Sequence, residues 1–156
     1  MIHTYGHHSV KVLSIQLVRF EQVHEVLAGK RAVKTDLDAL GLPFSSGITF
    51  GQLLFVSGQG PLDKNGKLVQ GDIKAQTKAT LENFRRVVEA AGSSMENVLQ
   101  TTVYLKDLKD YVGMNEAYSK FFREPKPARA TVQVADLLFG MRVEIQGIAF
   151  VPLKRK

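Results

Sequence analysis

Two kinds of apolar pattern follow one another in a fixed order along this chain, and that order restricts its fold more than any other feature. Strand-like alternation and helical spacing give hairpin, helix, strand, helix and a closing pair of strands. The approximate ranges are 46–58, 73–91, 99–107, 108–122 and 126–151. Two helices in this order cover one face of a mixed sheet, so we predict an α+β fold.

The helices carry start and stop signals. Asp72 can cap the first helix and Gly92 can end it, while Asp107 can cap the second. Residues at helical spacing predict the buried stripe of each helix. The first stripe is Ile73, Thr77, Leu81, Phe84, Val88 and Ala91, and the second is Leu108, Tyr111, Val112, Tyr118 and Phe122.

The uncovered face of the predicted sheet would expose apolar side chains to water. Such a face is usually buried by oligomerisation. The 156 residues suffice for one domain, which we place at 31–156, with residues 1–30 as an N-terminal extension. The extension holds all four histidines, and a plain leader is a better interpretation of this group than a metal site.

The net charge of +6 is concentrated at the two ends of the chain. Residues 1–31 contribute +2, residues 154–156 contribute +3, and the body between them only +1. A nearly neutral body argues against a large nucleic-acid footprint. No run of residues is apolar enough for a membrane span and no secretory leader is visible, so we expect a cytoplasmic protein that binds no membrane.

The missing residue types exclude several chemistries from the body of the chain. The sequence has no cysteine, and no histidine follows His24. A thiol nucleophile, a Ser-His-Asp arrangement and a histidine metal site are therefore excluded there. Ser57, in "VSGQGP", has no strand–glycine–helix context of a phosphate loop, and we interpret it as part of a sharp strand end.

Two charged residues interrupt the alternating pattern of the closing strands. Arg129 shares a strand face with Thr131 and Gln133, and Glu144 shares one with Arg142 and Gln146. If these strands pair, both polar rows could face the same side. An arginine fork can then hold a carboxylate, and a nearby glutamate can activate water. The alternative is that Arg129 and Glu144 pair only with each other or with solvent.

Three segments closely resemble the Rid family, also known as YjgF proteins or L-PSP endoribonucleases. They are "LLFVSGQGPLD", "TTVYLKDLKDYVGMNEAYSKFF" and "PARATVQVADLLFGMRVEIQGIAFV", and the resemblance covers about residues 32–152. It implies a chorismate-mutase-like fold and a homotrimer with a central β-barrel and a cleft at each subunit interface. It also implies hydrolysis of reactive enamines and imines, such as 2-aminoacrylate, to 2-keto acids and ammonia without a cofactor or metal.

The resemblance also implies roles for individual residues. Arg129 matches the arginine that holds the substrate carboxylate, and Glu144 matches the acidic residue near the attacking water. Ser57 and Gly58 match the pair that lines the pocket, and Asn115 matches an asparagine on the second helix. Beyond these matches, we expect backbone N–H groups near Ser57–Gln59 to contact the substrate carboxylate. Three positions depart from the common pattern: Thr131 replaces a cysteine, Phe44 replaces a tyrosine, and Leu138 replaces a proline.

Two other functions remain open at the level of sequence. One is an RNA-cleaving or translation-inhibiting protein, which only the basic ends favour. The other is a non-catalytic trimer whose clefts bind small carboxylates. The departures at Phe44 and Thr131 from the family pattern are consistent with this alternative.

Overall fold

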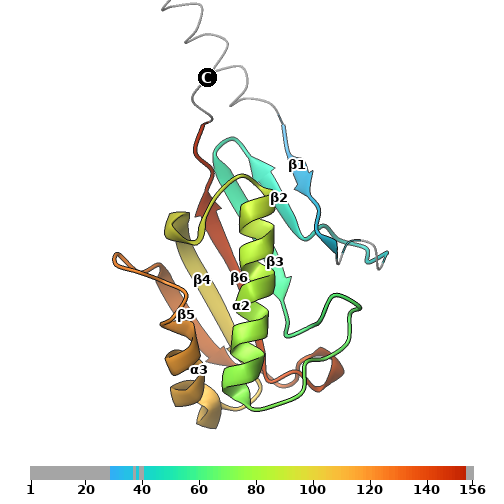
Figure 1. The fold of residues 1–156 in the computed structure, drawn as a ribbon, viewed down its shortest axis with the longest axis vertical. Coiled ribbons are helices and arrows are strands. Elements are labelled where there is room, and N and C mark those ends of the chain that lie inside the picture. The colour runs from blue at the N-terminus through green and yellow to red at the C-terminus, as the bar shows by residue number, and fades with distance from the viewer. Residues whose placement is uncertain (1–28, 37, 39–40, 154–156) are drawn as a thin grey trace, which may run out of the picture.

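The computed structural model describes residues 29–36, 38 and 41–153. Its strands and α-helices are β1 (Arg31–Val33), β2 (Gly47–Phe50), β3 (Leu53–Gln59), α2 (Ile73–Ala90), β4 (Val98–Leu105), α3 (Tyr111–Tyr118), β5 (Ala128–Gln133) and β6 (Val143–Phe150). The strands form one mixed sheet in the order β1-β2-β3-β6-β4-β5, and both helices lie on the same face of it (Figure 1). The predicted α+β arrangement is confirmed. The four histidines and the other residues of 1–28 lie outside the described residues.

The first hairpin and the first helix form as predicted. β2 and β3 pair antiparallel around a turn in which Gly51 has φ 58°, a conformation that glycine adopts without strain. The Asp72 side chain accepts a hydrogen bond from the Ala75 backbone N–H at 2.9 Å and caps α2. The predicted stripe of α2 is buried, with Leu81 and Phe84 fully enclosed, except that Ala91 follows the end of the helix and is only partly buried.

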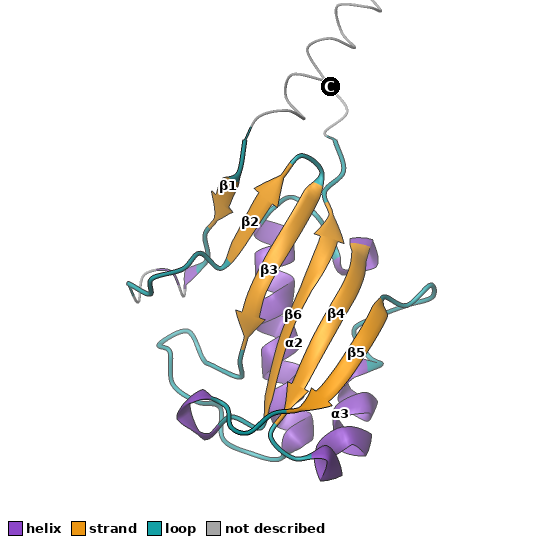
Figure 2. Ribbon diagram, turned by 180° about the vertical axis from the view of Figure 1, so that it is seen from behind, coloured by secondary structure: helices purple, strands orange, loops and turns teal. Residues whose placement is uncertain are grey.

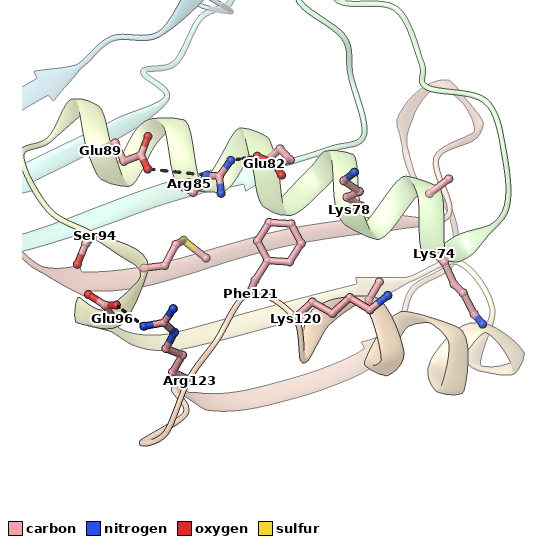
Figure 3. A pocket seen from close by; sticks show the side chains of 13 residues that line it. Lys74, Lys78, Glu82, Arg85, Glu89, Ser94, Glu96, Lys120, Phe121 and Arg123 are labelled. Atoms are coloured by element: carbon pink, nitrogen blue, oxygen red, sulfur yellow. Dashed lines mark hydrogen bonds and ion pairs between the residues drawn. The ribbon is translucent and has the colours of Figure 1, made fainter.

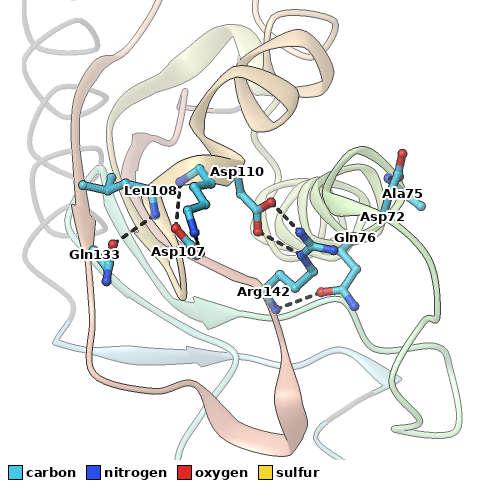
Figure 4. Close-up of polar contacts among 9 residues, drawn as sticks. Asp72, Ala75, Gln76, Asp107, Leu108, Asp110, Gln133 and Arg142 are labelled. Atoms are coloured by element: carbon cyan, nitrogen blue, oxygen red, sulfur yellow. Dashed lines mark hydrogen bonds and ion pairs between the residues drawn. The ribbon is translucent and has the colours of Figure 1, made fainter.

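The second helix differs from the prediction. A 3-10 turn (Leu108–Asp110) precedes it and it ends at Tyr118, four residues before the predicted end. Val112 is 67% exposed, so the predicted stripe is partly wrong. A long-range ion pair accounts for this, since Arg142 Nε and Nη2 bond both carboxylate oxygens of buried Asp110 at 2.9 and 2.5 Å (Figure 4). With Asp110 turned inward, helical spacing buries Met114 and Tyr118 and leaves Val112 outside.

The closing strands do not pair with each other, so that prediction is wrong. Both flank β4, which is parallel to β5 and antiparallel to β6. A parallel pair needs a crossover connection, and α3 supplies it between β4 and β5. The segment after β5 then passes β4 to reach β6 on the other side (Figure 2).

The sheet face opposite the helices is open, as predicted (Figure 2). Large apolar side chains on this face are exposed; they are Phe50, Leu53, Phe55, Val132 and Phe150. Among the described residues, no helix is both long and apolar enough to cross a membrane.

We expect Asp110→Asn to lower the free energy of unfolding by about 2 kcal/mol, because it weakens charge-assisted bonds that join α3 to β6. Chemical denaturation measures the change. Lys109→Ala is the matched control, since it removes a neighbouring ion pair that is exposed and 3.8 Å long, and should cost less than about 0.5 kcal/mol. Equal effects of the two substitutions would contradict the role assigned to Asp110.

Candidate functional site

Arg129 lies on β5, on the face of the sheet that carries the helices. Its guanidinium carbon is 4.6 Å from the centroid of the Tyr118 ring and 5.9 Å from that of Tyr111, both on α3. Its Nη1 lies 4.0 Å from the sulfur of Met114. Within the described residues, Arg129 makes no ion pair. The cation is held by aromatic rings, and its fork remains available to an anion.

The two tyrosines beside Arg129 have different environments. Tyr118 is buried, and its hydroxyl is 2.7 Å from the Thr101 hydroxyl. Burial raises the pKa of Tyr118. Tyr111 is 42% exposed, and a hydrogen bond from Asn115, together with the positive charge of Arg129, lowers its pKa. Buried Tyr118 thus packs against the guanidinium of Arg129, and exposed Tyr111 lies beside the same guanidinium.

Thr131 lies two residues along β5 and faces the same side as Arg129. Its hydroxyl oxygen is buried and has no hydrogen-bond partner among the described residues. Asn115 is half-buried on α3, so these two predicted residues do gather on the arginine side.

Glu144 lies on β6, on the open face of the sheet. It is half-buried, and burial raises the pKa of its carboxyl. A side chain at position 58 would collide with this carboxylate. Glycine at that position therefore allows the β3 backbone and the Glu144 carboxylate to approach each other. A carboxyl with a raised pKa beside an exposed backbone can take and return protons nearer to neutrality.

A β-bulge shapes the backbone beside Glu144. Ser57 and Gly58 together oppose one residue of β6, because the pairing shifts between Val56 and Gln59. The Ser57 hydroxyl donates to the Ser45 carbonyl at 2.7 Å, which ties the bulge to the loop that carries Phe44. Phe44 itself is 56% exposed. The Gln59 side chain is buried and donates to the Ser57 carbonyl at 3.0 Å, so only its backbone can serve a ligand.

The expectation that Arg129 and Glu144 face the same side is wrong within one chain. β4 pairs Thr101 with Arg129, and it pairs Tyr104 with Glu144. Thr101 and Tyr104 are three residues apart on one strand, so they point to opposite faces and their partners do too. The predicted site residues therefore form two candidate half-sites, one on each face of the sheet. The first holds Arg129, Thr131, Asn115 and the two tyrosines, and the second holds Glu144, Ser57, Gly58, Gln59 and Phe44 on the loop before β2.

A separate hollow of about 700 Å³ lies between α2, α3 and the 3-10 turn Met95–Asn97 (Figure 3). Several of its charges pair with one another: Arg85 with Glu82 and Glu89, and Arg123 with Glu96 at 3.9 Å. Neither Arg129 nor Glu144 lines it. In the described part of the chain, no three histidine, cysteine or carboxylate side chains gather as a metal site would require.

Comparison with known proteins places the chain in a family. The family model described as Endoribonuclease L-PSP matches residues 34–151. The chain belongs to this family. Its resemblance to Rid proteins, read from the sequence, is thereby confirmed.

Individual relatives of this L-PSP family member carry different names. A RutC family protein of Pyrococcus horikoshii is 48% identical over 109 residues, 69% of this chain and 86% of the relative. The 2-iminobutanoate/2-iminopropanoate deaminase of Salmonella typhimurium is 39% identical over 110 residues, with the same shares of 69% and 86%. The crystal structure of a Rid family protein from Yersinia pestis has TM-score 0.75 and 35% identity, covering 79% of this chain and all (100%) of that one.

Sequence reasoning did not assign Tyr111, Met114 and Tyr118 to the arginine half-site. Tyr111, Asn115 and Tyr118 follow one another at spacings of four and three, which places them on one face of a helix. That spacing was a usable signal. The spacing does not show that β4 pairs in parallel with β5, and this pairing brings the same face of α3 over Arg129.

We expect Glu144→Gln to raise the melting temperature of the separated chain, at a protein concentration too low for association, slightly at pH 8. Because burial raises the pKa of Glu144, its ionised form costs folding stability, and this cost is complete above the folded-state pKa. Below about pH 4 both states are protonated and the gain should vanish. Calorimetry across this pH range measures the difference. Glu96→Gln, at an exposed ion pair, is the control without such a gain, and a Glu144→Gln protein less stable than wild type at pH 8 would contradict the assignment.

Proposed function

We propose that this protein hydrolyses small 2-imino acids, formed from 2-enamines such as 2-aminoacrylate, to 2-keto acids and ammonia. The observation that carries the proposal is the guanidinium of Arg129, which is stacked on tyrosine and makes no ion pair within the described residues. Two relatives, 39% and 41% identical to this chain, are named 2-iminobutanoate/2-iminopropanoate deaminases, which supports the same chemistry.

Arg129 binds the substrate through its carboxylate. The planar fork suits two parallel hydrogen bonds to a carboxylate, which fixes both position and orientation. Fixing the carboxylate also places the adjacent C2 carbon, so that the attacking water meets it with much of the orientation cost already met.

Glu144 activates the water. As water adds to C2 of the protonated imine, the ionised carboxyl takes one proton and a carbinolamine forms. The protonated carboxyl returns that proton to the amine nitrogen, the C–N bond breaks, and ammonia leaves. The hydroxyl proton passes back to Glu144 as the keto group forms, and then to solvent or ammonia. The raised pKa of Glu144 suits both directions of transfer.

A homotrimer brings the two half-sites together. Arg129 and Glu144 lie on opposite faces of one sheet, so a complete site needs the Arg129 half-site of one chain beside the Glu144 half-site of another. The exposed apolar face around Phe55 and Phe150 supplies the surface that association would bury. In this assembly Thr131 stands beside the arginine of its own chain and beside the glutamate of a neighbour.

The substitutions at the site alter its lining without removing its charges. Thr131 keeps a small polar group, whose buried hydroxyl has no hydrogen-bond partner among the described residues. Phe44 keeps an aromatic ring on the loop tied to Ser57, but has no phenol hydroxyl.

The experiment that tests the proposed function is hydrolysis of freshly generated 2-aminoacrylate. Keto-acid binding without ammonia release would instead identify a carboxylate-binding trimer, and specific RNA cleavage by residues 31–153 alone would favour the nuclease.

Arg129→Ala should lower kcat/KM for 2-aminoacrylate by about a hundredfold or more, because the substrate loses its charged anchor. Arg129→Lys keeps the charge but not the fork, so its kcat/KM should lie between those of the wild type and Arg129→Ala. A serine dehydratase generates the substrate, and lactate dehydrogenase reports the pyruvate. Arg123→Ala, a highly exposed arginine outside both half-sites, is the control. Full turnover by Arg129→Ala would show that another residue binds the substrate.

Mixing two inactive variants should restore activity if the site lies between chains. Arg129→Ala and Glu144→Gln subunits, co-refolded in equal amounts, give trimers of which about three-quarters contain both kinds. Each mixed ring has one interface at which an intact Arg129 meets an intact Glu144, so about a quarter of all sites recover. The recovered kcat of verified mixed trimers measures this. No recovery would mean that one chain must supply both residues.

A further inference from the structure

The proposed reaction gives no role to the phenol of Tyr111, although it lies beside the anchoring arginine. Its oxygen is 3.5 Å from Nη2 of Arg129, and the residue is 42% exposed. We propose that the Tyr111 hydroxyl is a second carboxylate-binding group, donating a hydrogen bond to the substrate carboxylate that Arg129 holds. This inference rests on the proposed function and adds a residue to its binding site.

The surroundings of Arg129 direct a ligand toward Tyr111. The Tyr118 ring covers one face of the guanidinium at 4.6 Å, and Met114 lies against Nη1. Nη2 is the nitrogen that points to the exposed phenol. A carboxylate that reaches Nη2 therefore comes within hydrogen-bond range of the Tyr111 oxygen as well.

The hydrogen bonds around the phenol leave its own proton available. A phenol oxygen accepts through its lone pairs and donates through one O–H. Arg129 can only donate to that oxygen, and a hydrogen bond from Asn115 and the charge of Arg129 lower the pKa of Tyr111. A phenol oxygen that accepts from Arg129 keeps its O–H for another partner, and a substrate carboxylate bound at Nη2 supplies an acceptor.

The backbone under Tyr111 is fixed by a contact that the reaction does not use. Tyr111 directly follows Asp110, whose carboxylate is buried and accepts two hydrogen bonds from Arg142, the residue before β6 (Figure 4). The start of α3 is thereby joined to the sheet, so the phenol is held near Arg129 rather than carried on a loose turn.

Tyr111→Phe tests the proposal because it removes the hydroxyl and keeps the ring. The probe is 2-oxobutanoate, bound to the full-length protein and followed by titration calorimetry at pH 7. We expect the Kd to rise about tenfold in Tyr111→Phe and about a hundredfold in Arg129→Ala, with no change in Lys109→Ala. Melting temperature and oligomer size verify that each variant is folded.

The pH dependence of the same binding separates a donor from a structural residue. Above the phenol pKa, Tyr111 can no longer donate and its negative charge repels the carboxylate, so the wild-type Kd should rise. Arg129 of β5 is the charged group beside this phenol, and the other titratable group on the same guanidinium is Tyr118 of α3. Arg129 stays charged, and burial raises the pKa of Tyr118, so Tyr118 ionises later than Tyr111. Tyr111→Phe should lack the first alkaline rise.

The outcomes distinguish this inference from the function beneath it. If Tyr111→Phe binds 2-oxobutanoate as the wild type does at every pH, while Arg129→Ala does not, Tyr111 is only packing and the inference is wrong. If the wild type shows no alkaline rise, the inference is also wrong, and this measurement needs no variant. If the wild type neither binds 2-oxobutanoate nor hydrolyses 2-aminoacrylate, the proposed function falls and Tyr111 loses its role with it.

Discussion

The pairing of β4 with both β5 and β6 is the constraint on which the site depends. Residues that lie directly opposite one another on neighbouring strands share a face of the sheet. β4 places Arg129 beside Thr101 on the helix side, and Glu144 beside Tyr104 on the open side. A shift of β4 by one residue against either neighbour would move one charged group to the other face. The buried residues Val103 and Leu105 hold the register, because the same shift would expose them.

Within this frame, the chain retains several groups that folding alone would not select. Arg129 is stacked against tyrosines with no carboxylate partner in the described residues, and the Thr131 hydroxyl is buried without a hydrogen bond. Glu144 is half-buried at the cost of a raised pKa. Each is a local conflict of the kind that accumulates at functional sites. By contrast, Arg142 donates to both carboxylate oxygens of Asp110, and this pair joins the start of α3 to the sheet.

Local signals were enough to predict the elements of this fold, but not their neighbours. The Gly51 turn and the Asp72 cap depend on adjacent residues, so the sequence reveals them directly. Alternation along β5 and β6 shows which residues share a face within each strand, but it does not show that β4 lies between them. The predicted stripe of α3 is partly wrong for a related reason, because Asp110 is bonded by Arg142, which lies far along the chain. Candidate site residues were found through the resemblance, whereas their division into two half-sites required the sheet order.

In the proposed function, the separation of the half-sites couples chemistry to association. A single chain can present the arginine fork with its tyrosines, or the glutamate with its glycine-lined bulge, but not both toward one substrate. In the proposed trimer, burial of the apolar open face supplies the free energy that assembles the site, so folding residues such as Phe55 and Phe150 act on activity without touching substrate. Mass action then links the two properties, because dilution that separates the chains dismantles every site at once. The same coupling means that a substitution at this face can lower activity while each half-site keeps its local geometry.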